Sequence, residues 1–244
     1  MKDNFSAQAN DYARFRPHYP AEMIQYIMSN VAQHQNALDV ATGNGQVAAA
    51  LSPYFKQVYA VDISEQQLAN AAQLYNVHYK VANAEDLGFE DSTFDLITVA
   101  QAIHWFDFTA FYNEVDRLLN SNGVCAVLGY GLFSAGSEAD KVLHHLYREI
   151  LGSYWDEERK YLDENYSTIP FPFAEIVAQK FENRFSWNVE QLLGYLNTWS
   201  AVQHYINKNG INPVDLVKTE LQTIWCRGEK EVVFPLLLRI GRKV

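Results

Sequence analysis

The sequence predicts an α/β fold organised around a mostly parallel β-sheet, and three stretches of chain carry this prediction. Residues 38–42 form a short, largely apolar segment that runs into the turn Gly43-Asn44-Gly45, and a helix-forming run follows. Residues 58–62 are a second apolar segment that ends on a carboxylate. Residues 93–100 are almost continuously apolar, which is typical of a central strand covered on both faces. The first two stretches, with the helix between them, have the layout of a βαβ nucleotide-binding unit.

The glycine turn and the carboxylate at the end of the second strand predict a nucleoside site. Gly43 and Gly45 let backbone N–H groups approach a ligand closely, and the following helix begins with unpaired N–H groups. Asp62 is placed to accept both hydroxyls of a ribose, and Ile63 would pack on the adenine. The structural alternative is a tight turn that needs glycine in any case, with the acids acting as helix caps.

Asp39 favours one class of nucleoside over another. The pattern Gly43-x-Gly45-x-x-Ala48 also fits the dinucleotide fingerprint, so a nicotinamide-dependent oxidoreductase is an alternative. A carboxylate four residues before the first glycine would repel a pyrophosphate and attract a cation. S-adenosylmethionine carries a sulfonium, an ammonium and a ribose diol and has no phosphate, and therefore it fits this turn better.

Composition limits the remaining classes. The chain has 244 residues, 48% of them hydrophobic and 20% charged, which suits one α/β domain over residues 1–244. Its net charge of −10 argues against a nucleic-acid partner. Cys125 and Cys226 are far apart and have no metal-binding spacing, so we expect no metal. The polar start and the lack of a long apolar run predict a cytoplasmic protein with no membrane partner, whether monomer or dimer.

Residues 1–35 are predicted to form an N-terminal lid and a helix. Two prolines among aromatic residues disfavour a continuous helix over residues 13–20, and an amphipathic helix begins at Pro20. We expect Tyr12 and Arg16 to contact the cofactor and Tyr19 to contact the acceptor, since a lid would bring them over the site. Packing and surface charge are the alternative explanation for these three side chains.

Residues 36–130 are predicted to form the cofactor-binding core. After the βαβ unit, the chain should form a third strand at 77–81, a fourth at 93–100 and a fifth at 124–130. Residues just beyond the carboxyl ends of central strands face the ligand crevice of such a sheet. This rule assigns Gln101 to the cofactor, and His104, Trp105 and Tyr130 to the acceptor.

The rest of the chain predicts an inserted helical cap over residues 134–178, followed by the remaining sheet and helices over 179–244. Residues 181–187 alternate between apolar and polar, as an edge strand does, and helices are expected at 189–200 and 213–225. The last strand should cover 231–240, and Pro235 within it indicates an edge or a bulge.

With these residues in view, the chain resembles the class I S-adenosylmethionine-dependent methyltransferases, and within them the methyltransferase type 11 or trans-aconitate methyltransferase-like branch. The stretch from Asp39 to Gln46 resembles motif I of the whole superfamily. The branch resemblance rests on further segments: Phe5-Ser6, Tyr12, Arg16-Pro17 and Tyr19-Pro20 near the N-terminus, Ala102-x-His104-Trp105-Phe106-Asp107, and Thr198-Trp199-Ser200.

The resemblance implies a Rossmann-like sheet of seven strands in the order 3-2-1-4-5-7-6, with the seventh strand antiparallel. It also implies methyl transfer from S-adenosylmethionine, which leaves S-adenosylhomocysteine, to a small molecule and often to its carboxylate. Family members often have an acid at the position of Asn83, where it binds the adenine amino group; Asn83 and Ala84 are therefore expected cofactor contacts, and Glu85 or Asp86 could substitute for Asn83.

The acceptor decides what His104 has to do. A carboxylate is ionised at pH 7 and needs only cations or donors to hold it, for which Arg16, His104 and Tyr19 are candidates. For a phenol, alcohol or amine acceptor, from which a proton has to be removed, His104 is the candidate general base. Tyr12, Trp105, Tyr130 and Trp199 are expected to wall the pocket. A non-catalytic module that only binds S-adenosylmethionine is a third possibility.

Overall fold

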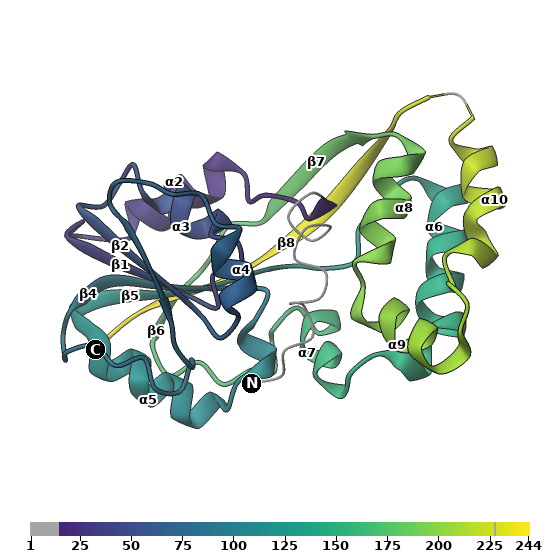
Figure 1. The fold of residues 1–244 in the computed structure, drawn as a ribbon. Helices are drawn as coiled ribbons and strands as arrows, with labels where there is room; N and C mark the ends of the chain where they lie inside the picture. The colour runs from purple at the N-terminus through teal and green to yellow at the C-terminus, as the bar shows by residue number, and fades with distance from the viewer. Residues whose placement is uncertain (1–14, 227) are drawn as a thin grey trace.

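A computed structural model describes residues 15–226 and 228–244 of the chain. A twisted sheet with helices on both faces forms one part of the molecule, and a group of helices lies beyond one end of the sheet (Figure 1). The predicted contact residue Tyr12 lies outside the described residues. No helix within the described ranges is long and apolar enough to cross a membrane.

The sheet has the strand order β3-β2-β1-β4-β5-β8, with β6 and β7 both paired to β8. Strands β1 to β5 are parallel, and β8 runs antiparallel to β5. The predicted order 3-2-1-4-5-7-6 is confirmed, with one difference: two short strands share the last position. The strands are β1 (Asn36–Val40), β2 (Gln57–Asp62), β3 (Val77–Val81), β4 (Phe94–Ala100), β5 (Leu119–Tyr130), β6 (Ala174–Ile176), β7 (Phe181–Trp187) and β8 (Lys230–Arg242).

Pro235 lies in an interior strand, so of the two predicted explanations the edge is wrong. Its carbonyl accepts a hydrogen bond from the Gly131 N–H at 3.0 Å, just past the end of β5. Tyr130 pairs with Leu236, whereas Ser134 pairs with Val233, so the chain after β5 contains one extra residue opposite β8. Because the strand pairing is irregular at this point, no hydrogen bond between the strands requires an N–H from Pro235, which has none.

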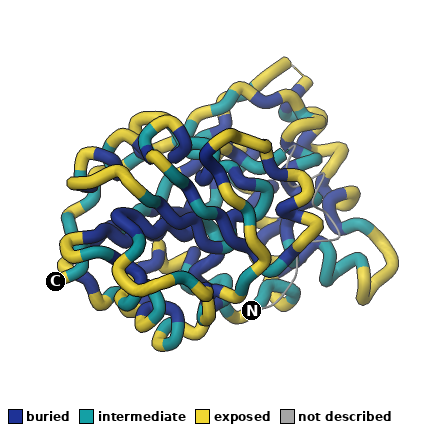
Figure 2. Tube along the Cα trace, turned by 60° about the vertical axis from the view of Figure 1, so that its left-hand side comes forward, coloured by how far each residue is buried: buried dark blue, intermediate teal, exposed yellow. Residues whose placement is uncertain are grey.

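Helices cover both faces of the sheet. Buried side chains of α2 and α3 pack against alternate residues of the central strands, and buried side chains of α5 pack against the residues between them. The central strands are accordingly buried along most of their length (Figure 2). The bounds are α2 (Ala21–Ser29), α3 (Gln46–Leu51), α4 (Glu65–Ala69), the short helix η2 (Ile103–Trp105) and α5 (Phe108–Leu118).

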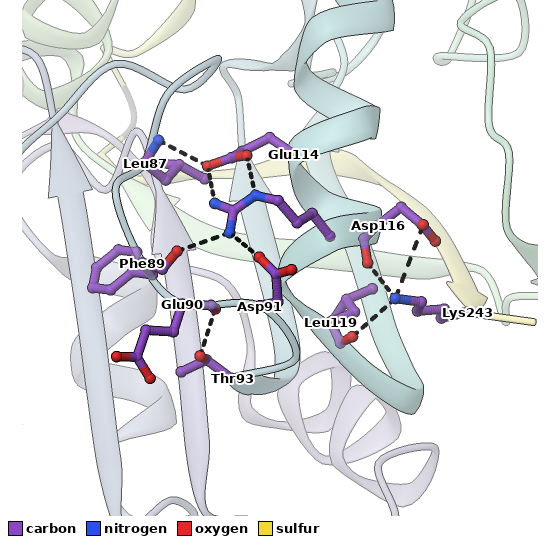
Figure 3. Close-up of polar contacts among 10 residues, drawn as sticks. Leu87, Phe89, Glu90, Asp91, Thr93, Glu114, Asp116, Leu119 and Lys243 are labelled. Atoms are coloured by element: carbon purple, nitrogen blue, oxygen red, sulfur yellow. Dashed lines mark hydrogen bonds and ion pairs between the residues drawn. The ribbon is translucent and has the colours of Figure 1, made fainter.

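Polar contacts tie α5 to the loop that precedes β4. The Arg117 guanidinium donates to both carboxylate oxygens of Glu114, at 2.9 and 2.7 Å, and to Asp91 at 2.5 Å. Glu114 also accepts from the Leu87 N–H at 3.1 Å, and just past the C-terminal end of the helix Lys243 donates to the Leu119 carbonyl at 3.1 Å (Figure 3). These contacts fix α5, the helix that follows η2.

The helices beyond the sheet come from two separate segments, residues 137–154 and 189–224, which we call the helical cap. Their buried side chains form one apolar cluster that also takes in residues of β7 and β8. The range predicted for the cap, 134–178, thus contains the first of these two segments and not the second. It also contains the strand β6. The cap helices are α6 (Ser137–His144), the π-helical η3 (His145–Ile150), η4 (Gly152–Tyr154), α8 (Val189–Asn197), α9 (Ser200–Asn209) and α10 (Asp215–Ile224).

Residues 155–169, which we call the bridging segment, connect the cap to the sheet. They contain η5 (Glu157–Arg159) and α7 (Lys160–Asp163). Leu162, Tyr166 and Ile169 are buried in the same apolar cluster as α5, whereas Trp155 packs against the cap cluster. The bridging segment therefore lies where the cap, the sheet and η2 meet.

Candidate functional site

The Asp39 carboxylate holds the glycine turn in place. Its Oδ2 accepts from the Thr42 hydroxyl at 2.5 Å and from the Ala48 N–H at 3.2 Å, and its Oδ1 accepts from the Thr98 hydroxyl at 2.7 Å. Burial raises the pKa of Asp39 to about 6, although these three hydrogen bonds oppose the rise. Asp39 thus links the turn to α3 and to β4, and it also lines the hollow described below. Nothing in the sequence pattern pointed to Thr98.

The two glycines of the turn serve different purposes. Both have positive φ, 57° at Gly43 and 80° at Gly45. A Cβ on Gly45 would lie 2.5 Å from the Tyr79 hydroxyl, so packing and conformation both require glycine. Among the described residues, a Cβ on Gly43 would have only Gln67 Oε1 within 4 Å, at 4.0 Å. Within that part of the chain, Gly43 therefore has space beside it that a ligand can use.

The Asp62 carboxylate lies at the end of β2, beside the turn. It accepts from the Gly43 N–H at 2.8 Å and from the Ser64 N–H at 2.9 Å, and it is 7% exposed. Ile63 follows it and is half-buried. The structure therefore brings Asp62 and Gly43 together, as the βαβ layout predicts.

Asn83 and Ala84, which were expected at the adenine together with Ile63, line neither of the two hollows described below. Asn83 is exposed, and its carbonyl accepts from the Asp86 N–H at 3.1 Å in a tight turn. The Ala84 side chain is buried in the core beside α5. Any contact of Ala84 with a ligand would be through its backbone.

The first hollow borders the glycine turn and encloses about 460 Å³, part of it open to solvent. It is lined from three directions: by the turn, by the end of β4 and β5, and by the N-terminal segment. The amide nitrogen of Gln46 is buried here, and within the described residues it has no hydrogen-bond partner. A polar ligand would satisfy it. The lining residues are Arg16, Pro17, Tyr19, Asp39, Ala41, Thr42, Gly43, Asn44, Gln46, Val47, Ala100, Gln101 and Tyr130.

Arg16 joins the N-terminal segment to both halves of the molecule. Its guanidinium donates to the Tyr130 hydroxyl at 3.0 Å and to the Thr198 carbonyl at 2.9 Å, and it lies 5.4 Å from the centre of the Tyr195 ring. Tyr19 packs beside Tyr130, with ring centres 6.3 Å apart. The segment thus covers the crevice between the end of β5 and the cap.

The second hollow lies between η2 and the cap and also encloses about 460 Å³, part of it open to solvent. It shares Arg16 and Gln101 with the first hollow, so the two adjoin. Gln101 has a φ of 54°, and its amide donates to the Tyr130 carbonyl at 3.2 Å. The lining residues are Arg16, Gln101, His104, Trp105, Trp155, Asp156, Arg159, Leu162, Trp199 and Ser200.

His104 is buried in the wall of the second hollow. Its side chain packs on Trp105, with ring centres 4.9 Å apart, and its Nδ1 lies 3.4 Å from the Tyr166 hydroxyl. Burial, and then the positive charge of Arg159, lower the pKa of His104 to about 3. The imidazole is therefore neutral at physiological pH and a very weak base, which argues against the general-base role.

The bridging segment supplies five residues that sequence reasoning did not single out: Trp155, Asp156, Arg159, Leu162 and Tyr166. The first four line the second hollow, and Tyr166 supports His104. The sequence signal for the position of Tyr166 is Gly129, a glycine within the strand β5. A Cβ there would lie 2.6 Å from the Tyr166 ring, so the close approach of the ring requires glycine. Within the described residues, no group of three His, Cys, Asp or Glu side chains is arranged to hold a metal ion.

A family model and individual known proteins that are similar to this chain all indicate the same family. A family model described as a methyltransferase domain matches residues 38–127, which span β1 to β5. A Dictyostelium discoideum protein named as a methyltransferase is 32% identical, covering 99% of this chain and 95% of that one. A Saccharomyces cerevisiae protein named for S-adenosylmethionine-dependent methyl transfer is 25% identical over 91% of this chain and 89% of its own.

A solved structure described as a type II methyltransferase from Anaeromyxobacter dehalogenans is similar along nearly the whole chain. It is 35% identical, with a TM-score of 0.87, and the similarity covers 94% of this chain and 99% of that one. The similarity therefore includes the helical cap as well as the sheet.

Proposed function

This chain belongs to the class I S-adenosylmethionine-dependent methyltransferases, and on that premise we propose that it methylates a small molecule on a carboxylate or another oxygen nucleophile. One observation carries the proposal: two adjoining hollows share Arg16 and Gln101, one beside the glycine turn and one beneath the cap. A methyltransferase needs such a pair, because donor and acceptor must meet in line at one place.

The residues around the glycine turn fit S-adenosylmethionine, which supplies an electrophilic methyl group on its sulfonium. Within the described residues, the buried Gln46 amide lacks a partner and Gly43 has space beside it. We propose that Asp62 accepts the ribose hydroxyls, that Ile63 and the backbone of Asn83 and Ala84 hold the adenine, and that the Asp39 charge favours the cationic part of the cofactor. Arg16 and Tyr12 would contact it from the lid, and Gln101 from the end of β4.

The low pKa of His104 supports an acceptor that needs no proton removed. A group whose pKa is about 3 removes protons poorly from a phenol or alcohol, whose pKa is about 10 or higher. A carboxylate is already anionic at pH 7. We therefore assign His104 to acceptor contact, together with Trp105 and Trp199, rather than to general-base catalysis. Tyr19 and Tyr130, which were also expected at the acceptor, line the first hollow, and we propose that they contact the acceptor only where the two hollows adjoin.

The alternative functions lose support. Membership of the methyltransferase family argues against a nicotinamide-dependent oxidoreductase, which the glycine pattern also fitted. A module that only binds S-adenosylmethionine would have no use for the second hollow, which His104, Trp105 and Trp199 line. That hollow favours a catalytic protein.

Calorimetric titration with S-adenosylhomocysteine, with NAD in parallel, tests the cofactor. Binding of the former alone, lost in D62A, would support the proposal, and binding of NAD alone would contradict it. An acceptor screen with S-adenosylmethionine and small carboxylic acids follows, with mass spectrometry to detect the methyl ester. Methylation only of amines would overturn the assignment of an oxygen nucleophile.

A further inference from the structure

Arg159 is held firmly at one end of its guanidinium. Its side chain is 19% exposed and lies over the rings of Trp155 and Tyr147, 4.8 and 5.4 Å from their centres. Its Nε donates to the Tyr147 hydroxyl at 2.8 Å, and that hydroxyl in turn donates to Asp163 at 2.7 Å. The stacking and this chain of hydrogen bonds fix the orientation of the guanidinium plane.

The other end of the guanidinium is unused. Neither Nη1 nor Nη2 makes a hydrogen bond within the part of the chain that the structure describes, and the residue lines the second hollow. The Asp163 carboxylate lies 3.7 Å from Nε and is 49% exposed, so it neutralises the charge only in part. A mostly buried guanidinium with two unbonded terminal nitrogens presents a fork of N–H donors to whatever enters the hollow.

The surroundings of this fork favour a carboxylate over a phosphate. The hollow contains a second guanidinium, on Arg16, which already donates to Tyr130 and Thr198, and one carboxylate, on Asp156. Asp156 would repel a dianion more strongly than a monoanion. The indole rings of Trp105, Trp155 and Trp199 also line the hollow and suit a flat, apolar body.

We propose that Arg159 anchors a carboxylate of the acceptor and so makes small organic acids with a flat, apolar body the substrate class of this site. The inference rests on the proposed function, since it assigns the second hollow to the acceptor. It also accounts for the environment of His104, whose imidazole Arg159 disfavours in its charged form. A bound carboxylate would offset that charge.

Binding of matched acids and amides to the full chain tests the anchor. The probes are benzoate and trans-cinnamate, each against its primary amide, with phenyl phosphate as a dianion, titrated with and without saturating S-adenosylhomocysteine. We expect the wild type to bind at least one acid about tenfold or more tightly than its amide, and R159M to lose that preference. The acid should also move the imidazole resonances of His104.

Two further variants keep the result interpretable. K160M removes the neighbouring cation, which is exposed and does not line the hollow, and it should leave the preference unchanged. R159K retains the charge without the planar fork and should lose most of the preference; it also decides the question if R159M does not fold.

The outcomes separate the two proposals. Equal affinity for acids and amides in the wild type, an unchanged preference in R159M, or tighter binding of phenyl phosphate would each overturn the anchor. Failure of S-adenosylhomocysteine to bind would contradict the proposed function instead, because acid binding to the free chain is measured separately.

Discussion

The Tyr166 hydroxyl lies 3.4 Å from Nδ1 of His104, although 62 residues separate them in the sequence. The rings are stacked with their centres 6.1 Å apart, and Tyr166 is fully buried. The same hydroxyl lies 3.4 Å from Oε1 of Gln101. One residue of the bridging segment thus supports two residues that follow β4, and the cap is fixed to the sheet at the wall of the second hollow.

Replacing Tyr166 with alanine should destabilise the protein by about 3–5 kcal/mol, because it removes a fully buried aromatic ring. Urea unfolding measures the loss. Y75A is the control, since Tyr75 is 93% exposed and its loss should change stability by less than about 0.5 kcal/mol. Similar effects for the two variants would show that the Tyr166 ring contributes nothing to packing.

Gly129 should tolerate no side chain while Tyr166 is present. A Cβ would lie 2.6 Å from the ring, so G129A should cost about 1–3 kcal/mol of unfolding free energy. The cost should shrink in the double variant G129A/Y166L, and a double-mutant cycle measures the coupling. G152A is the matched control, because a Cβ there meets no atom of the described residues within 4 Å. Additive effects would rule out the steric explanation.

Asp39 should make the protein less stable as the pH rises from about 4 to about 6. Its pKa is raised from 3.8 to about 6 on folding, so the folded state holds a proton that the unfolded state has lost. The difference corresponds to a loss of at most about 3 kcal/mol, complete above pH 6. Unfolding of D39N between pH 4 and 7 should lack this slope.

D86N provides the comparison for Asp39, because it removes an exposed carboxylate and changes the net charge equally. It should retain the wild-type slope. If the slope persists in D39N and disappears in D86N, the pH dependence comes from Asp86, and the prediction for Asp39 is wrong.

His104 should be replaceable by a neutral hydrogen-bonding residue. Because its pKa is lowered to about 3, the imidazole does not titrate between pH 5 and 8. We expect H104Q to retain kcat/KM within about tenfold and to show the same pH profile over that range as the wild type, once an acceptor is identified. A loss above about a hundredfold, with loss of an inflection near pH 6.5, would restore the general-base role.

The sequence predicted those elements whose pattern is contained in a few consecutive residues. The alternation at Phe181–Trp187 and the short segment predicted as a third strand at Val77–Val81 match β7 and β3 residue for residue. The βαβ layout likewise identified Asp62 and Gly43, because short-range chain geometry brings them together. In contrast, the contacts of Arg159 and Tyr166 depend on how a helical segment folds back on a sheet, and no local period encodes that.

Thr98 and Asp39 show the same limit on a smaller scale. The carboxylate was expected to face a cation, but it also accepts hydrogen bonds from the Thr42 hydroxyl, the Ala48 N–H and the Thr98 hydroxyl on the neighbouring strand β4. A single sequence shows a buried strand around Thr98, and does not reveal which neighbouring strand its hydroxyl reaches.

The position of β8 has a consequence for the order of assembly. This strand lies between β5 and the pair formed by β6 and β7, yet it is the last strand in the chain. Until residues 230–242 have been synthesised, β5 and β7 each present an open edge, and the apolar cluster shared by the cap and β8 lacks Val232 and Phe234. Nascent chains that stall before residue 230 should therefore require chaperones and be prone to aggregation.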